Sequence, residues 1–135
     1  RCAADGPTPE AVSQVEVAPL DESQIGELVA TIGAEAFVEL ANMALADIPG
    51  SIASVGEALT AGDIEGARDE THNLTSTLGS YGMRAAYLAA EELEIACREN
   101  RSEVARELFG KVDAMSQDAR TALERYIDAQ RASVA

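Results

Sequence analysis

The single histidine of this 135-residue chain, His72, is the side chain best suited to nucleophilic chemistry. Imidazoles are largely neutral near pH 7, and a neutral ring has a nitrogen lone pair that attacks phosphorus without a separate general base. Phosphoryl transfer then depends mainly on in-line positioning and on neutralising the phosphoryl oxygens. An exposed His72 would therefore be a candidate phosphoryl acceptor.

The exposure of His72 follows from a predicted helix that begins after the capping residue Asp63 and weakens around Gly79 and Gly82. His72 points more than about 100° away from the centre of the apolar stripe of this helix, so it faces solvent. The stripe consists of Ile64, Ala67, Thr71, Leu74 and Leu78.

The predicted face of His72 carries small or basic neighbours. Arg68 lies one turn before it, about 40° away around the helix, and Thr75 and Ser76 lie about one turn after it. Exposed helix positions more commonly hold Glu, Lys or Arg, which are better helix formers than Ser or Thr. The pattern favours close approach of a partner, although Thr75 and Ser76 also fit an ordinary polar surface.

Two glycines, Gly79 and Gly82, are candidate docking positions for that partner, because they lack side chains beside the His72 face. A helix end or close helix packing explains them equally well. If the turn between them brings the next helix back, Arg84 also approaches His72, although a plain surface charge is the simpler role for it.

The rest of the chain predicts four more helices. A short one begins at an Asp21 cap, with Gln24 in the capping-box position and Leu20 and Ile25 as a hydrophobic staple, and it ends at Gly33. The others run from about 34 to 60, from the Gly82 turn to about 100, and from about 102 to 132.

These long helices are amphipathic. We expect Pro49-Gly50 to kink or break the helix over 34–60, and Gly62 to end it. Its predicted stripe is Phe37, Leu40, Ala44, Ile48, Ile52, Val55 and Leu59. The next helix presents Met83, Ala86, Ala90, Leu93 and Cys97, and the last presents Val104, Leu108, Met115, Leu123 and Ile127.

Composition and length indicate one all-α domain. The chain is 47% hydrophobic but only 4% aromatic, which is typical of helices packed through small aliphatic side chains. Short connections favour an antiparallel four-helix bundle with a short additional N-terminal helix over residues 20–132. Residues 1–19 hold three of the four prolines and predict a linker or poorly ordered arm.

The net charge of −14 opposes nucleic-acid and anionic-membrane partners, which need a basic surface. Charges interrupt every apolar stretch well short of the roughly 20 residues of a membrane span. Cys2 and Cys97 form neither a metal motif nor a disulfide framework, so we expect a cytoplasmic location. The start at Arg rather than Met, without a signal-peptide pattern, fits a piece excised from a larger protein.

A metal enzyme in a helical bundle would have to use carboxylates such as Glu91, Glu92 and Glu94. A di-iron site of that kind needs paired Glu-x-x-His motifs, and one histidine cannot supply two. Zinc lacks sufficient His and Cys ligands. We expect no metal and interpret the acidic run as a solvated face.

The segment THNLTSTLGSYG resembles the histidine-phosphotransfer (HPt) family of two-component phosphorelays. His72 and Leu74 match the family's His-x-Leu core, and Gly79 and Gly82 match its later Gly-x-x-Gly. Leu93-Glu94 matches its Leu-Glu on the following helix, and the order of elements over residues 20–63 is also similar.

This resemblance implies a four-helix bundle that is phosphorylated on His72 and has neither an ATP site nor a cofactor. The phosphoryl group would pass to or from an aspartate of a response-regulator receiver domain, which carries Mg²⁺ itself. A sensor or hybrid histidine kinase would be the other implied partner.

One departure from the family concerns charge. Members commonly carry Lys three residues after the histidine and often Gly next, where this chain has Thr75 and Ser76. We hypothesise that Arg68 partly replaces the lysine, because its guanidinium can pair with phosphate oxygens. Thr75 and Ser76 would add hydroxyl donors.

Three variants of this interpretation stay open. The chain could be a scaffold that docks receiver domains without carrying phosphate. Thr75, in place of the family's lysine, would then be the substitution that abolished transfer. It could instead be the histidine-bearing domain of a chemotaxis-type kinase, or the C-terminal domain of a hybrid kinase. Labelling with a phosphorylated receiver separates the scaffold from a carrier.

Overall fold

The computed structural model describes residues 18–134, with side chains through residue 132. The helices are α2 (Glu22–Ile32), α3 (Ala34–Ala61), α4 (Ile64–Ser80), α5 (Arg84–Arg98) and α6 (Ser102–Val134). Their bounds lie within a few residues of those expected from the sequence. The predicted arm over 1–19 falls outside the described residues except for its last two positions, and Cys2 lies outside them as well.

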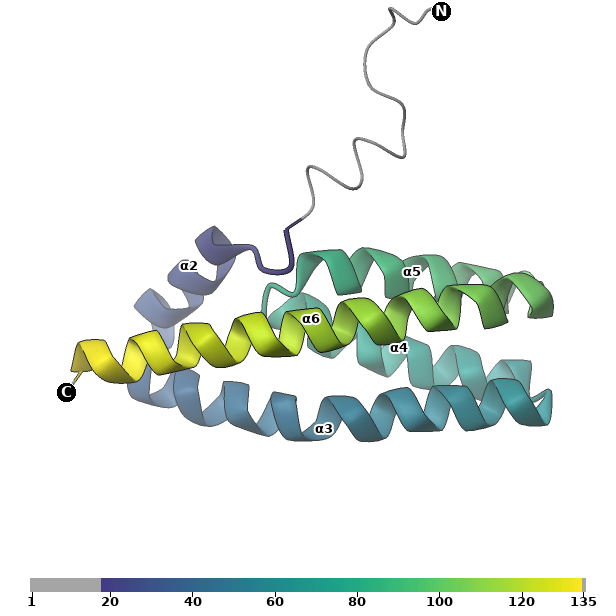
Figure 1. The fold of residues 1–135 in the computed structure, drawn as a ribbon, viewed down its shortest axis with the longest axis horizontal. Coiled ribbons are helices and arrows are strands. Elements are labelled where there is room, and N and C mark those ends of the chain that lie inside the picture. Colours follow the sequence, from purple (N-terminus) through teal and green to yellow (C-terminus); the bar gives the residue numbers. More distant parts are fainter. Residues whose placement is uncertain (1–17, 135) are drawn as a thin grey trace, which may run out of the picture.

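The four longer helices form an antiparallel bundle. Each packs against two neighbours, in the cyclic order α3, α4, α5, α6, and short turns connect consecutive helices. Figure 1 shows α3 and α6 extending together beyond the α4–α5 pair, with α2 lying across that end. The predicted fold class is confirmed. None of the described helices is both long and apolar enough to cross a membrane.

The core is built largely from alanines and branched aliphatic side chains, with few aromatic rings. Phe37 is fully buried and meets the ring of Tyr126 edge to face, at 5.8 Å between centroids. Burying a side chain of this size contributes about 1.5–3 kcal/mol. The predicted stripe of α5 is fully buried, and that of α4 is buried except for the partly exposed Ile64. Small residues on these faces allow α4 and α5 to pack closely.

Helix α3 differs from its prediction at two points. It continues unbroken through Pro49, so a break at this position was wrong. Pro49 costs one backbone hydrogen bond, but the helix is held on both sides of it by the buried Ile48 and Ile52. Leu40 is 44% exposed rather than in the core, because Ala41 takes the inward position one turn after Phe37.

Helix α6 buries a different set of residues from the one predicted. Leu123 and Ile127 are buried as expected, whereas Val104, Leu108 and Met115 lie at the edge of the core. The inward positions near them belong to smaller side chains, which a search for large apolar residues overlooks. These are Ala105, Val112, Ser116 and Ala119.

Both predicted aspartate caps are present. Asp21 Oδ1 accepts from the backbone N–H of Gln24 at 3.1 Å, and Asp63 Oδ1 accepts from that of Gly66 at 3.0 Å. The prediction of a full capping box was wrong, because the Gln24 side chain does not bond back to the Asp21 N–H. The Gln24 amide donates to the Gly79 carbonyl at 2.7 Å, and the Asp21 N–H donates to the Gly82 carbonyl at 2.7 Å.

These two bonds connect α2 to the α4–α5 turn. Of the predicted staple, Ile25 is buried and packs near Gly82, and Leu20 is partly buried against the core. The N-terminal helix is therefore anchored close to the end of the helix that carries His72.

Candidate functional site

His72 lies on the outer face of α4, as expected, with 67% of its side chain exposed. Its neighbours on either side of the helix face, Thr71 and Leu74, are buried and fix the orientation of this turn. An exposed ring on a rigid helix is accessible to a partner without any rearrangement of the core.

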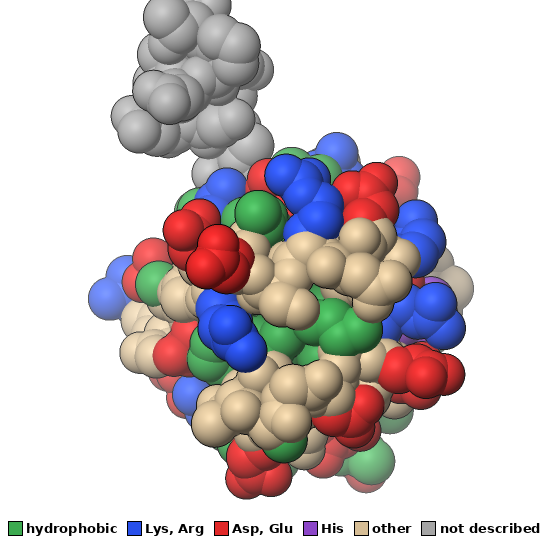
Figure 2. All heavy atoms as spheres, turned by 90° about the vertical axis from the view of Figure 1, so that its right-hand side faces the viewer, with side chains coloured by type: hydrophobic (Ala, Val, Ile, Leu, Met, Phe, Trp, Pro, Cys, Tyr) green, Lys and Arg blue, Asp and Glu red, His purple; other side chains and the backbone are tan. Residues whose placement is uncertain are grey.

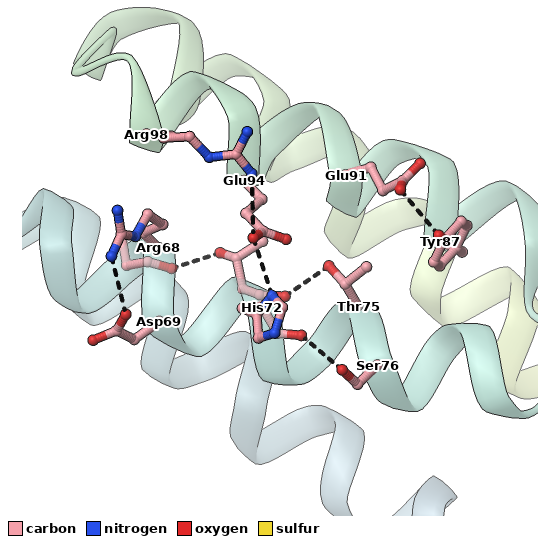
Figure 3. A network of polar contacts seen from close by, with 11 residues as sticks. Arg68, Asp69, His72, Thr75, Ser76, Tyr87, Glu91, Glu94 and Arg98 are labelled. Atoms are coloured by element: carbon pink, nitrogen blue, oxygen red, sulfur yellow. Dashed lines mark hydrogen bonds and ion pairs between the residues drawn. The ribbon is translucent and has the colours of Figure 1, made fainter.

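The carboxylate of Glu94 on α5 holds the imidazole. Its Oε2 lies 3.0 Å from His72 Nδ1, across the α4–α5 contact (Figure 3). A carboxylate accepts hydrogen bonds, so the neutral ring carries its proton on Nδ1 and keeps the lone pair on Nε2. The contact therefore orients the ring and leaves Nε2 as the nucleophilic nitrogen.

A cation completes this arrangement. Arg98 Nη2 lies 3.5 Å from the same Glu94 oxygen, one turn further along α5. The Arg98 side chain is 57% exposed, whereas that of Glu94 is only 15% exposed. His72, Glu94 and Arg98 thus form a chain of polar contacts that runs from α4 to α5, with an arginine at its outer end.

Two of the predicted phosphate neighbours, Arg68 and Ser76, lie on the exposed surface beside His72. Arg68 Nη2 is 3.9 Å from Asp69 Oδ1, at the outer limit of an ion pair. Ser76 Oγ donates a long bond of 3.3 Å to the His72 carbonyl. Both side chains remain accessible to an incoming group.

Thr75 differs from its expected position on the exposed surface. Its residue is only 7% exposed, and its hydroxyl donates to the Thr71 carbonyl at 2.7 Å. The hydroxyl is satisfied within the helix by the carbonyl four residues earlier. Because a hydroxyl has a single proton to donate, this arrangement leaves none for a phosphoryl oxygen.

The two predicted docking glycines serve the packing of the α4–α5 turn. A Cβ on Gly79 would lie 3.1 Å from the ring of Tyr87, so this position accommodates an aromatic side chain. Gly82 is buried, has a φ of 66°, and a Cβ there would approach Ile25 to 2.9 Å. Both glycines therefore have a packing role in this turn, and partner docking beside them stays a prediction.

Two open hollows meet at His72. The larger, about 700 Å³, runs along the α4–α5 contact and is bordered by Gln24, Ser76, Arg84 and Tyr87. The smaller, about 410 Å³, is bordered by Arg68 and Asn73. His72, Glu94 and Arg98 border both. Arg84 borders the larger hollow at the start of α5, ten residues before Glu94 and so about 15 Å along the helix from it.

A second carboxylate in the larger hollow is already paired. Tyr87 donates its hydroxyl to Glu91 Oε2 at 2.9 Å, and this bond, together with the nearby Glu91 charge, raises the pKa of Tyr87. Tyr87 therefore stays protonated and remains the hydrogen-bond donor to Glu91. Among the described residues no group of three or more potential metal ligands occurs.

Charge at one end of the bundle is mixed. Figure 2 views the bundle from the end that holds the α3–α4 and α5–α6 turns, and shows acidic and basic side chains interspersed around a small apolar centre. The acidic surplus of the chain does not form a single negative field on this face. A partner that approaches near this end meets basic groups as well as acidic ones.

The residue that sequence reasoning missed is Arg98. Its pairing with Glu94 follows the i, i+4 spacing of a helix and was visible in principle. That Glu94 itself reaches His72 was not visible, because the two residues lie 22 positions apart on different helices. Only the packing of α4 against α5 brings them together.

Comparison with known proteins gives a family and a fold. By sequence, no curated protein matches the chain significantly. Among solved structures, histidine-containing phosphotransfer protein B (HptB) from Pseudomonas aeruginosa PAO1 is similar, with a TM-score of 0.78 and 18% identity. The match covers 84% of this chain and 98% of HptB. The model of the Hpt domain matches residues 39–132, so this chain belongs to the Hpt domain family.

Proposed function

We propose that this chain is a phosphoryl carrier that accepts a phosphoryl group on His72 and exchanges it with the aspartate of a response-regulator receiver domain. The observation that carries the proposal is the exposed ring of His72, held through Nδ1 by Glu94 at 3.0 Å. Family membership supports the same chemistry. A sensor or hybrid histidine kinase would supply the phosphoryl group to the relay.

The transfer needs little from this chain beyond the ring. The Nε2 lone pair forms the new bond to phosphorus as the bond from phosphorus to the aspartate oxygen breaks, and the aspartate leaves as a carboxylate. The ring gains positive charge and keeps its Nδ1 proton, which Glu94 stabilises across the hydrogen bond. The reverse step restores the lone pair to Nε2.

The remaining apparatus belongs to the partner. The Mg²⁺ that neutralises the receiver's phosphoaspartate would be bound by the receiver, and this chain would act as a carrier without an ATP site of its own. We place the exchange in the cytoplasm, because the described cysteine, Cys97, is a free thiol.

Docking would use the exposed face of α4 and part of α3. Apolar contacts on these faces would supply contact area, while the arginines near His72 would select an acidic surface. The acidic active site of a receiver domain meets that requirement.

The proposal is tested by incubating the chain with a panel of purified receiver domains carrying labelled phosphoryl groups. Transfer should give an acid-labile, alkali-stable label on the wild type and none on His72→Gln. Binding of receivers without any label would instead make the chain a docking scaffold. A label that persists in His72→Gln would place the acceptor elsewhere.

A further inference from the structure

The position where relatives carry a lysine holds Thr75, which is buried and already donates its hydroxyl to the Thr71 carbonyl. The phosphoryl group proposed for His72 would therefore receive no positive charge from this position. It would carry close to two negative charges near pH 7. A cation must come from elsewhere on the surface or from the partner.

Three arginines border the hollows at His72, and they differ in position. Arg68 borders only the smaller hollow, and Arg84 only the larger one. Arg98 borders both, and it contacts the same Glu94 oxygen that holds the ring of His72. Of these three arginines, Arg98 is thus the one that contacts Glu94, the hydrogen-bond partner of His72.

We propose that Arg98 binds the phosphoryl group on His72 and so sets how strongly this chain retains it; the proposal rests on the phosphoryl-carrier function. The charge support would come from α5, in place of the lysine that relatives carry on the histidine's own helix. Arg98 is then a phosphoryl ligand and not only a partner of Glu94.

The chemistry of the guanidinium allows both contacts. It presents five N–H donors in a planar fork, so one edge can stay on Glu94 while another donates to a phosphoryl oxygen. The Arg98 side chain is 57% exposed, so its outer end is free to turn toward the new charge. No covalent bond changes at Arg98, and no proton leaves it.

A contact that exists only after phosphorylation favours the phosphorylated state. Arg98 should therefore shift the phosphoryl-exchange equilibrium toward this chain and slow loss of the phosphoryl group to water. For a charge-assisted contact at a partly exposed site, the expected shift is about five-fold.

The test measures the equilibrium of phosphoryl exchange with one receiver domain, approached from both directions, and the lifetime of isolated phosphohistidine. Arg98→Ala should move the equilibrium about five-fold toward the receiver and shorten the lifetime, and Arg98→Lys should recover part of both. Arg101→Ala is the matched control, because Arg101 pairs with Glu99 at 3.6 Å and is equally exposed. It should behave as the wild type.

A double-variant cycle separates phosphoryl binding from positioning of Glu94. In the Glu94→Gln background, adding Arg98→Ala should still shift the exchange equilibrium. No further shift would mean that Arg98 acts only through Glu94, and that outcome overturns the proposal. Wild-type behaviour of Arg98→Ala would also overturn it. The same holds if the equilibrium shifts and the lifetime shortens in Arg68→Ala alone. If the wild type takes no phosphoryl group from any receiver, the carrier function itself fails.

Discussion

At the scale of single residues, the site depends on one hydrogen bond between two helices. Glu94 fixes the tautomer of His72, since a carboxylate at Nδ1 requires the proton there and leaves the lone pair on Nε2. In the phosphorylation proposed for His72, the ring would become more positive, and the negative charge of Glu94 would become more stabilising. The same group would therefore orient the ring and assist the reaction.

Replacing Glu94 with Gln tests the charge separately from the orientation. The amide oxygen can still accept the Nδ1 hydrogen bond, but it cannot balance the charge that develops on the ring. We expect phosphorylation of His72 to slow about five- to ten-fold, measured as the initial rate of label uptake from a phosphorylated receiver.

Glu92→Gln is the matched control for Glu94→Gln. Glu92 is a neighbouring glutamate on α5 whose carboxylate pairs with Lys111 on α6 at 3.1 Å, away from His72. Its substitution removes the same charge from the same helix and should leave the rate unchanged. Equal slowing in both variants would attribute the effect to overall charge.

At the scale of elements, the α4–α5 turn decides where Glu94 meets His72. Gly82 adopts a φ of 66° and is closely packed beneath α2, and its carbonyl receives the Asp21 N–H. The turn returns α5 along α4 at a distance that small residues permit. An error in this turn would shift α5 relative to the histidine.

Gly82→Ala should destabilise the fold by about 2–4 kcal/mol, because it combines an unfavourable φ with a Cβ too close to Ile25 and to the Asp21 carbonyl. The control is Gly110→Ala in α6, where a Cβ meets nothing within 4 Å. That change should stabilise by about 0.5–1 kcal/mol, as alanine does in a helix. Urea unfolding measures both, and equal values would refute the packing role of Gly82.

At the scale of elements, some features of the fold are predictable from the sequence and others are not. Helix ends were predictable because caps are local: Asp21, Asp63 and Gly62 lie within a few residues of the groups they satisfy. The exposure of His72 was predictable for the same reason, from the period of one helix.

Contacts between helices were not predictable in this way. The Gln24 bond to the Gly79 carbonyl spans 55 positions, and the Glu94 bond to His72 spans 22. These features depend on how helices are paired, and a single sequence carries no direct signal for the pairing.

At the scale of the whole molecule, the bundle is a rigid support for one exposed ring. Four helices share a continuous core, and His72 stands on the outside of α4, so a partner can reach it without opening the fold. The net charge of −14 opposes association with nucleic acids, while Arg68 and Arg98 border the hollow beside the ring proposed to carry phosphate. This arrangement suits a carrier that meets other proteins briefly and stays folded throughout.

The most direct test locates the phosphorus atom on the intact chain. The chain is labelled with ¹⁵N in its single histidine, phosphorylated by a receiver domain, and examined by ³¹P and ¹⁵N NMR. Phosphorus should be bonded to Nε2 of His72, with the Nδ1 proton retained toward Glu94. Phosphorus on Nδ1, or on any residue other than His72, would contradict the assignment of the nucleophile.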